Sequence, residues 1–196
     1  MTVAVLFARS DSIYKSIPGC DVWDVDRDAL RWPGGAPVVA HPPCRAWGSL
    51  RHFAKPRPGE MNLAWFALGA VRKWGGVLEH PKASKLWEEA KLPRGNEFDE
   101  FGGWTLAVNQ CWFGHRAEKA TLLYIVGVRP AKLAALPMSR KPPTHVIAQS
   151  HDRKAGRRVK SSRGWRPEVS PREREATPPE FAYWLVDLAR QCRMLR

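Results

Sequence analysis

A cysteine follows two prolines at the end of a short apolar run in the first quarter of the chain. The stretch reads Ala36-Pro-Val-Val-Ala-His-Pro-Pro-Cys44, in which residues 38–40 have the composition of a buried strand. Proline has no amide hydrogen for a sheet ladder, so the prolines end this strand and leave Cys44 just beyond it. Parallel sheets bind ligands at such strand ends. A cysteine placed there could act on a ligand, because its thiolate is a strong nucleophile. The local alternative is a buried, purely structural cysteine.

A carboxylate occupies the same kind of position farther along the chain. The stretch Gly76-Val-Leu-Glu-His-Pro81 is again apolar and ended by proline, with Glu79 near its end. Taken alone, such a glutamate is usually a solvated surface residue. Beside a cysteine at a neighbouring strand end, Glu79 becomes a candidate acid or hydrogen-bonding group of one shared cleft.

Acidic residues also follow the predicted second strand, which covers residues 21–25. They are Asp24, Asp26 and Asp28. Nucleotide-binding folds hold a ribose hydroxyl with an acid at this place. A solvated turn explains the same residues equally well.

Histidine and cysteine pairs raise the question of a metal. His41 with Cys44, and Cys111 with His115, have spacings found among zinc ligands, but neither pair is a Cys-x-x-Cys knuckle, and we expect no metal. The four cysteines are too widely spaced to suggest a disulfide framework, which indicates a reducing, cytoplasmic setting.

Composition predicts one globular domain with an anionic partner. The chain has 196 residues, 44% of them hydrophobic, and ten tryptophans, which suits a single core. No apolar run is long enough to cross a membrane, and no secretory signal is recognisable. The formal net charge of +13 points to nucleic acid. A basic run over residues 153–160 carries much of this charge; a solvated face is the alternative for it.

The elements expected around these residues alternate between strands and helices. We expect strands over residues 3–7, 21–25, 38–40 and 76–81, and paired strands over 106–112 and 121–128. Helices are expected over 13–17, 60–74 and 84–91. The stretch Thr177-Pro-Pro-Glu180 reads as a capping box that opens a last amphipathic helix. Between residues 130 and 174 the chain is basic and rich in loops, and only 144–148 has a strand-like composition.

With these stretches identified, the chain resembles a compact DNA (cytosine-5) methyltransferase of the small phage type. The stretch His41-Pro-Pro-Cys44 is similar to the family's Pro-Pro-Cys motif, which implies that Cys44 attacks C6 of the base. The stretch Leu78-Glu-His-Pro81 is similar to the Glu-Asn-Val or Glu-Asn-Pro motif, which implies that Glu79 contacts N3 of the base in its protonated form.

Two later segments extend the resemblance. The stretch Trp112-Phe-Gly-His-Arg-Ala-Glu-Lys119, followed by a strand, is similar to the family segment Phe-Gly-x-x-Gln-x-Arg-x-Arg. It implies that Arg116, with Lys119 as a second candidate, lies near O2 of the base. The stretch from Thr177 to Ala182 resembles the family's final helix. The four motifs occur in family order and span nearly the whole chain.

The resemblance implies an α/β fold, namely a Rossmann-like methyltransferase-type sheet with flanking helices in one domain, 1–196. It implies S-adenosylmethionine as cofactor, contacted by Phe7, Asp24, Asp26 and Pro42. The chain departs from the family in three places. Residues 7–12 lack the glycines of the cofactor loop. Only a short connection links residues 28 and 36, so a third strand is missing. Segment 130–174 replaces the target-recognition region.

The expected function is modification of a flipped pyrimidine in DNA, with methyl transfer to cytosine C5 as the default. This activity would belong to the cytoplasm of a bacterial host, from a phage or host gene. Two alternatives stay open: a base-modifying or base-excising enzyme that does not use S-adenosylmethionine, and a non-catalytic nucleic-acid-binding relative. Arg45, as the nearest cation, is expected to activate Cys44. The candidate nucleic-acid-binding residues are Arg45, Arg51, Lys119, Arg153, Lys154, Arg157, Arg158 and Lys160.

Overall fold

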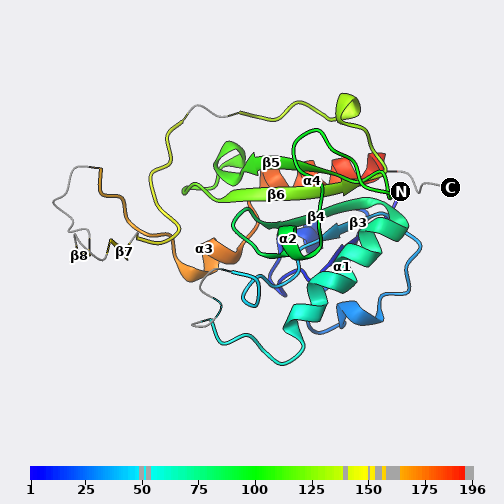
Figure 1. Cartoon of the computed structure of the whole chain (residues 1–196), viewed down its shortest axis with the longest axis horizontal. Coiled ribbons are helices and arrows are strands. Elements are labelled where there is room, and N and C mark those ends of the chain that lie inside the picture. Colours follow the sequence, from blue (N-terminus) through cyan, green and yellow to red (C-terminus); the bar gives the residue numbers. More distant parts are fainter. Residues whose placement is uncertain are drawn as a thin grey trace.

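A mixed β-sheet brings the predicted strand ends to a common edge. The computed structural model describes residues 1–48, 51, 54–138, 141–149, 151–152, 156–157 and 164–192. Its main sheet has six strands in the order β2-β1-β3-β4-β6-β5 (Figure 1). The strands are β1 (Val3–Leu6), β2 (Cys20–Trp23), β3 (Val38–Ala40), β4 (Gly76–Pro81), β5 (Trp104–Asn109) and β6 (Ala120–Val126).

Strand direction identifies the edge of the sheet at which ligands are expected. Strands β1 to β4 are mutually parallel, whereas β6 runs antiparallel to both β4 and β5. The chain places β2 on one side of β1 and β3 on the other. The carboxyl ends of β1 and β3 therefore form a topological switch point, the usual ligand position in open α/β sheets. The fold is thus α/β and Rossmann-like in general.

The sheet ends at β2 in the part of the chain that the structure describes. A short 3-10 helix, η2 (Ala29–Arg31), and a turn lead from β2 directly to β3. No further strand pairs with the free side of β2 within the described residues. This arrangement agrees with the short connection that the sequence predicted between residues 28 and 36.

Helices cover both faces of the sheet. Successive β1 residues point to opposite faces: Val3 and Val5 pack into one cluster with helix α4 (Pro179–Gln191), and Ala4 and Leu6 into another with helix α1 (Glu60–Trp74). Helix α2 (Leu86–Glu89) lies on the α1 side, and the 3-10 helix η1 (Ile13–Ser16) on the α4 side. All four β1 residues are completely buried, which fits an inner parallel strand.

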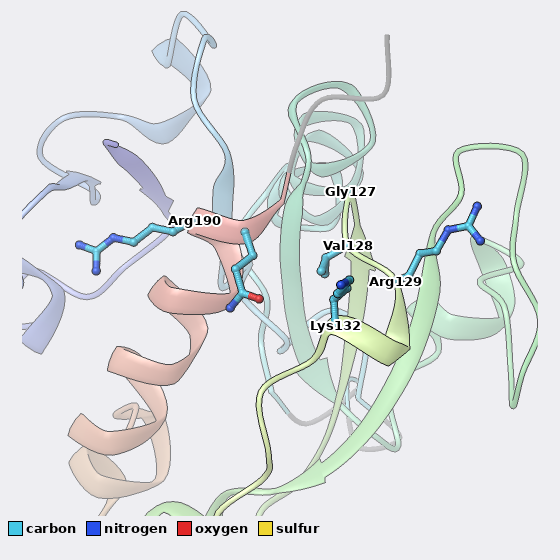
Figure 2. A pocket seen from close by; sticks show the side chains of 6 residues that line it. Gly127, Val128, Arg129, Lys132 and Arg190 are labelled. Carbon is cyan, nitrogen blue, oxygen red and sulfur yellow. The ribbon is translucent and has the colours of Figure 1, made fainter.

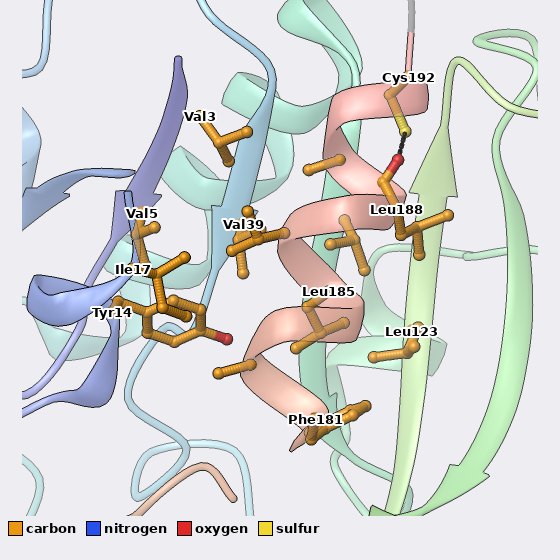
Figure 3. Packing of buried hydrophobic residues seen from close by; sticks show 14 of the residues in the cluster. Val3, Val5, Tyr14, Ile17, Val39, Leu123, Phe181, Leu185, Leu188 and Cys192 are labelled. Carbon is orange, nitrogen blue, oxygen red and sulfur yellow. Dashed lines mark hydrogen bonds between the residues drawn. The ribbon is translucent and has the colours of Figure 1, made fainter. Parts of the chain in front are cut away.

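Helix α4 closes one face of the core. Figure 3 shows Phe181, Leu185 and Leu188 directed from α4 toward the sheet, near Val39 and Leu123. The helix contributes an unbroken buried stripe because its apolar residues recur at helical spacing. Segments from the two ends of the chain thus share one core.

The ends of the two long helices are determined by glycine and proline. Helix α1 has the predicted bounds and ends at Gly75. Gly76 begins β4 at φ 125°, so close to the Val38 backbone that a Cβ atom would collide with it. The predicted capping box at α4 is wrong. The N-cap is Pro178, which has no side-chain acceptor, so no side chain caps this helix.

The remaining described elements are short. They include 3-10 helices η3 (Gln110–Phe113) and η4 (Pro130–Lys132), helix α3 (Pro171–Glu175), and a two-stranded sheet of β7 (His151–Asp152) and β8 (Gly156–Arg157) away from the main sheet (Figure 1). The strand predicted over 144–148 is reduced to single bridges at His145 and Val146. No described helix has the length and apolarity needed to span a bilayer.

Replacing Leu185 by alanine tests the role of α4. Leu185 is fully buried, so the Leu185→Ala variant should lose about 2–5 kcal/mol of unfolding free energy in urea denaturation. The matched control is Tyr183→Ala on the same helix, where the side chain is 48% exposed and a change within about 0.5 kcal/mol is expected. Equal losses in both variants would contradict this packing.

Candidate active site

The turn after β3 holds Cys44 at the carboxyl edge of the sheet. The Cys44 carbonyl accepts hydrogen bonds from the amides of Trp47 and Gly48, at 3.0 and 3.1 Å. Trp47 is completely buried, packs edge-on against Trp65, and accepts a hydrogen bond from the Lys85 amide through its carbonyl. This tryptophan anchors the turn, while the Cys44 side chain remains exposed. The cysteine is therefore not the buried structural residue of the alternative interpretation.

The register of β3 and β4 brings the two predicted strand-end motifs together. Ala40 pairs with Leu78, so the next residues, His41 and Glu79, are neighbours across the two strands. The His41 amide donates to the Leu6 carbonyl and so adds one more rung next to β1. His41 Nδ1 lies 3.0 Å from Glu79 Oε2, and both side chains are 12% exposed.

A chain of hydrogen bonds extends from this pair in both directions. The Tyr14 hydroxyl, fully buried beside α4, lies 2.8 Å from His41 Nε2. On the other side, Gln110 Nε2 donates to Glu79 Oε1 and to Thr121 Oγ1, each at 3.1 Å. Elements η1, β4, η3 and β6 each contribute one residue to this array, and His41 comes directly after β3; we call the array the polar chain.

The polar chain holds Glu79 as a carboxylate. Burial alone would raise its pKa, but the hydrogen bond and charge of His41, followed by the charges of Lys119 and His80, lower the pKa to about 2. The sequence interpretation had Glu79 acting in its protonated form. In the free protein the ionised form is the stable one at neutral pH.

Cys44 has the opposite environment. Although the thiol is exposed, nearby protein desolvates the thiolate and, together with the negative charge of Glu79, raises the pKa of Cys44. Lys119 opposes this shift. The Arg45 guanidinium, which was expected to activate Cys44, binds both carboxylate oxygens of buried Glu60, at 3.0 and 2.9 Å.

Two basic residues were proposed near the base, and Lys119 is the one whose charge influences both Cys44 and Glu79. Its charge lowers the pKa of both Cys44 and Glu79, and its Nζ donates to the Ala176 carbonyl at 3.3 Å. Arg116 is exposed and forms a two-point ion pair with Glu173. Lys119 therefore acts on Cys44 and Glu79 through its charge, whereas Arg116 is directed to Glu173 of α3.

A cavity of about 400 Å³ lies at the same edge of the sheet, where the loops after β1, β2 and β3 meet. Its volume falls in the usual range for small-molecule sites. Its lining combines apolar side chains with acids and two arginines. The residues are Phe7, Ala8, Asp24, Val25, Asp28, Ala29, Leu30, Pro43, Arg45, Arg57, Pro58, Gly59, Glu60 and Leu63.

The predicted cofactor residues divide into two groups. Phe7 and Asp24 line the cavity, whereas Asp26 and Pro42 do not, and Pro43 lies there instead of Pro42. Asp24 is buried and already engaged: Lys15 lies 2.6 Å from Oδ2, and Oδ1 accepts two backbone amides. Asp28 is better able than Asp24 to accept hydrogen bonds from a ligand. Its Oδ1 accepts one from the Leu30 amide, which leaves Oδ2 for a ligand.

The cofactor loop without glycine still leaves this cavity open. Phe7 itself adopts φ 60°, a conformation that glycine accepts without strain, and its amide donates to the Trp23 carbonyl. Arg9 turns away to Asp11 and Glu175 and does not line the cavity. The cavity's size and partly apolar walls suit a small molecule of about nucleoside size.

The predicted nucleic-acid-binding residues are only partly described. Arg51 is partly exposed, and Arg45 and Lys119 have the partners given above. Arg157 belongs to β8. Arg153, Lys154, Arg158 and Lys160 lie outside the described residues.

A second cavity, of about 480 Å³, lies at the opposite edge of the sheet, beyond the carboxyl end of antiparallel β6. Arg129, Lys132 and Arg190 contribute to its wall. Figure 2 shows the Arg129 and Arg190 side chains pointing away from each other. Arg190 is already bonded to Asp187 and to the Pro18 carbonyl. The cationic groups do not converge, so this cavity is not a candidate anion site.

Sequence reasoning did not identify Tyr14 or Gln110, and it considered His41 only as a zinc ligand. Gln110 follows the end of β5, and Tyr14 lies on the short helix before β2, so neither has a distinctive motif. The sequence offered one indication for His41: it is a polar residue at the end of a buried strand, directly before the two prolines. Among the described residues, no group of three or more histidine, cysteine and acidic side chains is placed to hold a metal ion.

Comparisons with known proteins leave this geometry as the evidence about function: no family model, curated protein or solved structure matches the chain.

His80, directly after Glu79, should make stability depend on pH. It is completely buried, and burial lowers its pKa from 6.5 to about 4, against the opposing influence of Glu79 and the Pro43 carbonyl. The unfolded chain therefore binds more protons between these values, so stability falls as pH decreases. Between pH 7 and 5 the loss attributable to His80 is about 2 kcal/mol.

The variant His80→Asn, which cannot titrate, should lose this part of the slope in urea denaturation at pH 7, 6 and 5. A lower absolute stability of the variant does not affect the comparison, because the slope is the measured quantity. An unchanged slope would show that His80 is not held neutral by the fold.

Proposed function

We propose that this chain modifies a pyrimidine base of DNA by covalent catalysis through Cys44, with methyl transfer from S-adenosylmethionine to C5 as the default reaction. The observation that carries the proposal is the juxtaposition of three features at one sheet edge. An exposed Cys44 follows β3, Glu79 lies on adjacent β4, and a nucleoside-sized cavity borders Pro43 and Arg45.

The chemistry begins with addition of the Cys44 sulfur to C6 of the base. The C5=C6 electron pair then moves onto C5 and the ring heteroatoms, which makes C5 nucleophilic. Lys119 is the cation best placed to stabilise the developing negative charge, and Glu79 to orient the ring by hydrogen bonding. Because the pKa of Cys44 is raised in the free protein, deprotonation has to accompany substrate binding.

The cofactor would be held by the walls of the cavity. Apolar Phe7, Leu30 and Leu63 suit a purine ring, and Asp28 suits ribose hydroxyls. When bound, S-adenosylmethionine supplies an electrophilic methyl group. The edge position of β2 and its direct connection to β3 also support the proposed methyltransferase-type sheet that lacks a third strand.

The proposed DNA partner follows from charge and from the need to expose the base. A thiol can reach C6 only after the base leaves the stack, and extrusion requires firm binding of the flanking phosphates. The net charge of +13 supports such binding.

Nucleoside mass spectrometry of DNA from an expressing host tests the modification. A new 5-modified pyrimidine should appear with the wild-type chain and disappear with Cys44→Ser. The control is Cys111→Ser, a partly buried cysteine on η3, which should leave the modification in place. A modification that persists in Cys44→Ser contradicts covalent catalysis by this residue.

Calorimetry tests the cofactor separately. S-adenosylmethionine should bind with micromolar affinity, and Leu63→Trp should weaken binding at least about tenfold by filling the cavity. The matched control is Met61→Trp, exposed on the same helix and outside the cavity wall, with unchanged affinity expected.

A reaction without S-adenosylmethionine is the second candidate, because the carboxylate of Asp24 is already occupied by Lys15. Base modification by a protein that gives no heat of binding with S-adenosylmethionine would favour it. DNA binding without any base modification would instead favour a non-catalytic relative.

A further inference from the structure

We infer that the base accepted by this site is one with a hydrogen on N3, namely uracil, in preference to cytosine. This inference deepens the proposed function and rests on it. It departs from the default of cytosine, and it follows from the directions of the hydrogen bonds around Glu79.

The first carboxylate oxygen of Glu79, Oε2, accepts a hydrogen bond from His41. Tyr14 is buried, and its pKa is raised well above the ordinary value, so its hydroxyl keeps the proton. The Tyr14 hydroxyl lies 2.8 Å from His41 Nε2, on the far side of the imidazole, and holds the ring in place. Nδ1 lies 3.0 Å from Oε2, and an ionised carboxylate can only accept, so Nδ1 carries a hydrogen and donates to Glu79.

The second carboxylate oxygen of Glu79, Oε1, accepts a hydrogen bond from Gln110. The Thr121 hydroxyl donates to the Lys119 carbonyl at 3.2 Å, so its oxygen is left to accept. The group facing it must then be the NH₂ of Gln110, whose other hydrogen points to Glu79 Oε1. Gln110 is 1% exposed, so water has little access to alter this arrangement.

Glu79 therefore faces the site as a hydrogen-bond acceptor. Each carboxylate oxygen has a second lone pair, and 12% of the side chain remains exposed, so Glu79 can still accept a hydrogen from a base. The positive charge of Lys119 supports the ionised form, and so does the low pKa of the glutamate.

Pyrimidines differ at the ring atom that such an acceptor would meet. In uracil and thymine N3 carries a hydrogen and can donate to the carboxylate. In cytosine N3 is itself an acceptor, so its lone pair would oppose the lone pairs of Glu79, and only the neighbouring 4-amino group could donate to the carboxylate. Placing the N3 lone pair of cytosine against an ionised carboxylate is therefore unfavourable, whereas the N3 hydrogen of uracil adds a hydrogen bond to that carboxylate.

Hydrogen exchange at C5 tests this preference without any group donor. Addition of the Cys44 sulfur to C6 lets C5 take up a deuteron from D₂O. Loss of the original C5 hydrogen as a proton and cleavage of the C–S bond then restore the base with deuterium at C5. The substrates are two single-stranded oligonucleotides that differ only in one dU or one dC, and mass spectrometry follows the deuterium.

We expect exchange in dU to be at least about tenfold faster than in dC with the wild-type chain. Glu79→Gln supplies the discriminating readout, because an amide both donates and accepts. In that variant the dU-to-dC ratio should fall at least about fivefold, whatever the change in absolute rate. Cys44→Ser should show no exchange in either oligonucleotide.

The outcomes separate the two levels of the proposal. Equal exchange in both bases, faster exchange in dC, or an unchanged ratio in Glu79→Gln overturns the inference while covalent catalysis by Cys44 stands. If folded wild-type protein binds both oligonucleotides and exchanges neither, thiol addition itself is wrong, and the proposed function fails together with the inference.

Discussion

The hydrogen bond between His41 and Glu79 is the interaction on which the rest of the site depends. It can form only because β3 and β4 are adjacent and parallel, with Ala40 opposite Leu78. Moving either strand by one residue would turn one side chain to the other face of the sheet. Gly76 contributes to this register, because only glycine allows β4 to begin so close to the Val38 backbone.

Burial strengthens the hydrogen bond between His41 and Glu79, but it also imposes a desolvation penalty on the carboxylate. An ionised carboxylate that is largely withdrawn from water is unfavourable unless donors surround it. Here His41 and Gln110 each satisfy one oxygen, and Tyr14 satisfies the far side of the imidazole. The core around α4 therefore supports the site directly, since Tyr14 packs in the same apolar cluster as Phe181 and Leu185.

Much of the fold could be predicted from the sequence, because its signals are local. The strand ends at Pro42 and Pro81, the bounds of α1 and the short connection after β2 all follow from periodicity, proline and glycine. What could not be predicted are partners set by tertiary packing. Arg45 was expected to act on its neighbour Cys44, but the start of α1 places Glu60 within reach of its guanidinium. Thr177 was expected to cap α4, but the helix begins one residue later and its N-cap is Pro178.

Tyr14 links two distant parts of the chain: its hydroxyl contacts His41 of the site, and its ring packs in the apolar cluster to which α4 contributes. Tyr14 precedes β2, whereas α4 comes near the other end of the described chain, so the last helix supports a residue of the site as well as covering the sheet. The two ends of the chain consequently cannot vary independently. An exchange of α4 for another amphipathic helix would have to preserve the packing around Tyr14, because the imidazole of His41 depends on that hydroxyl for its contact at Nε2.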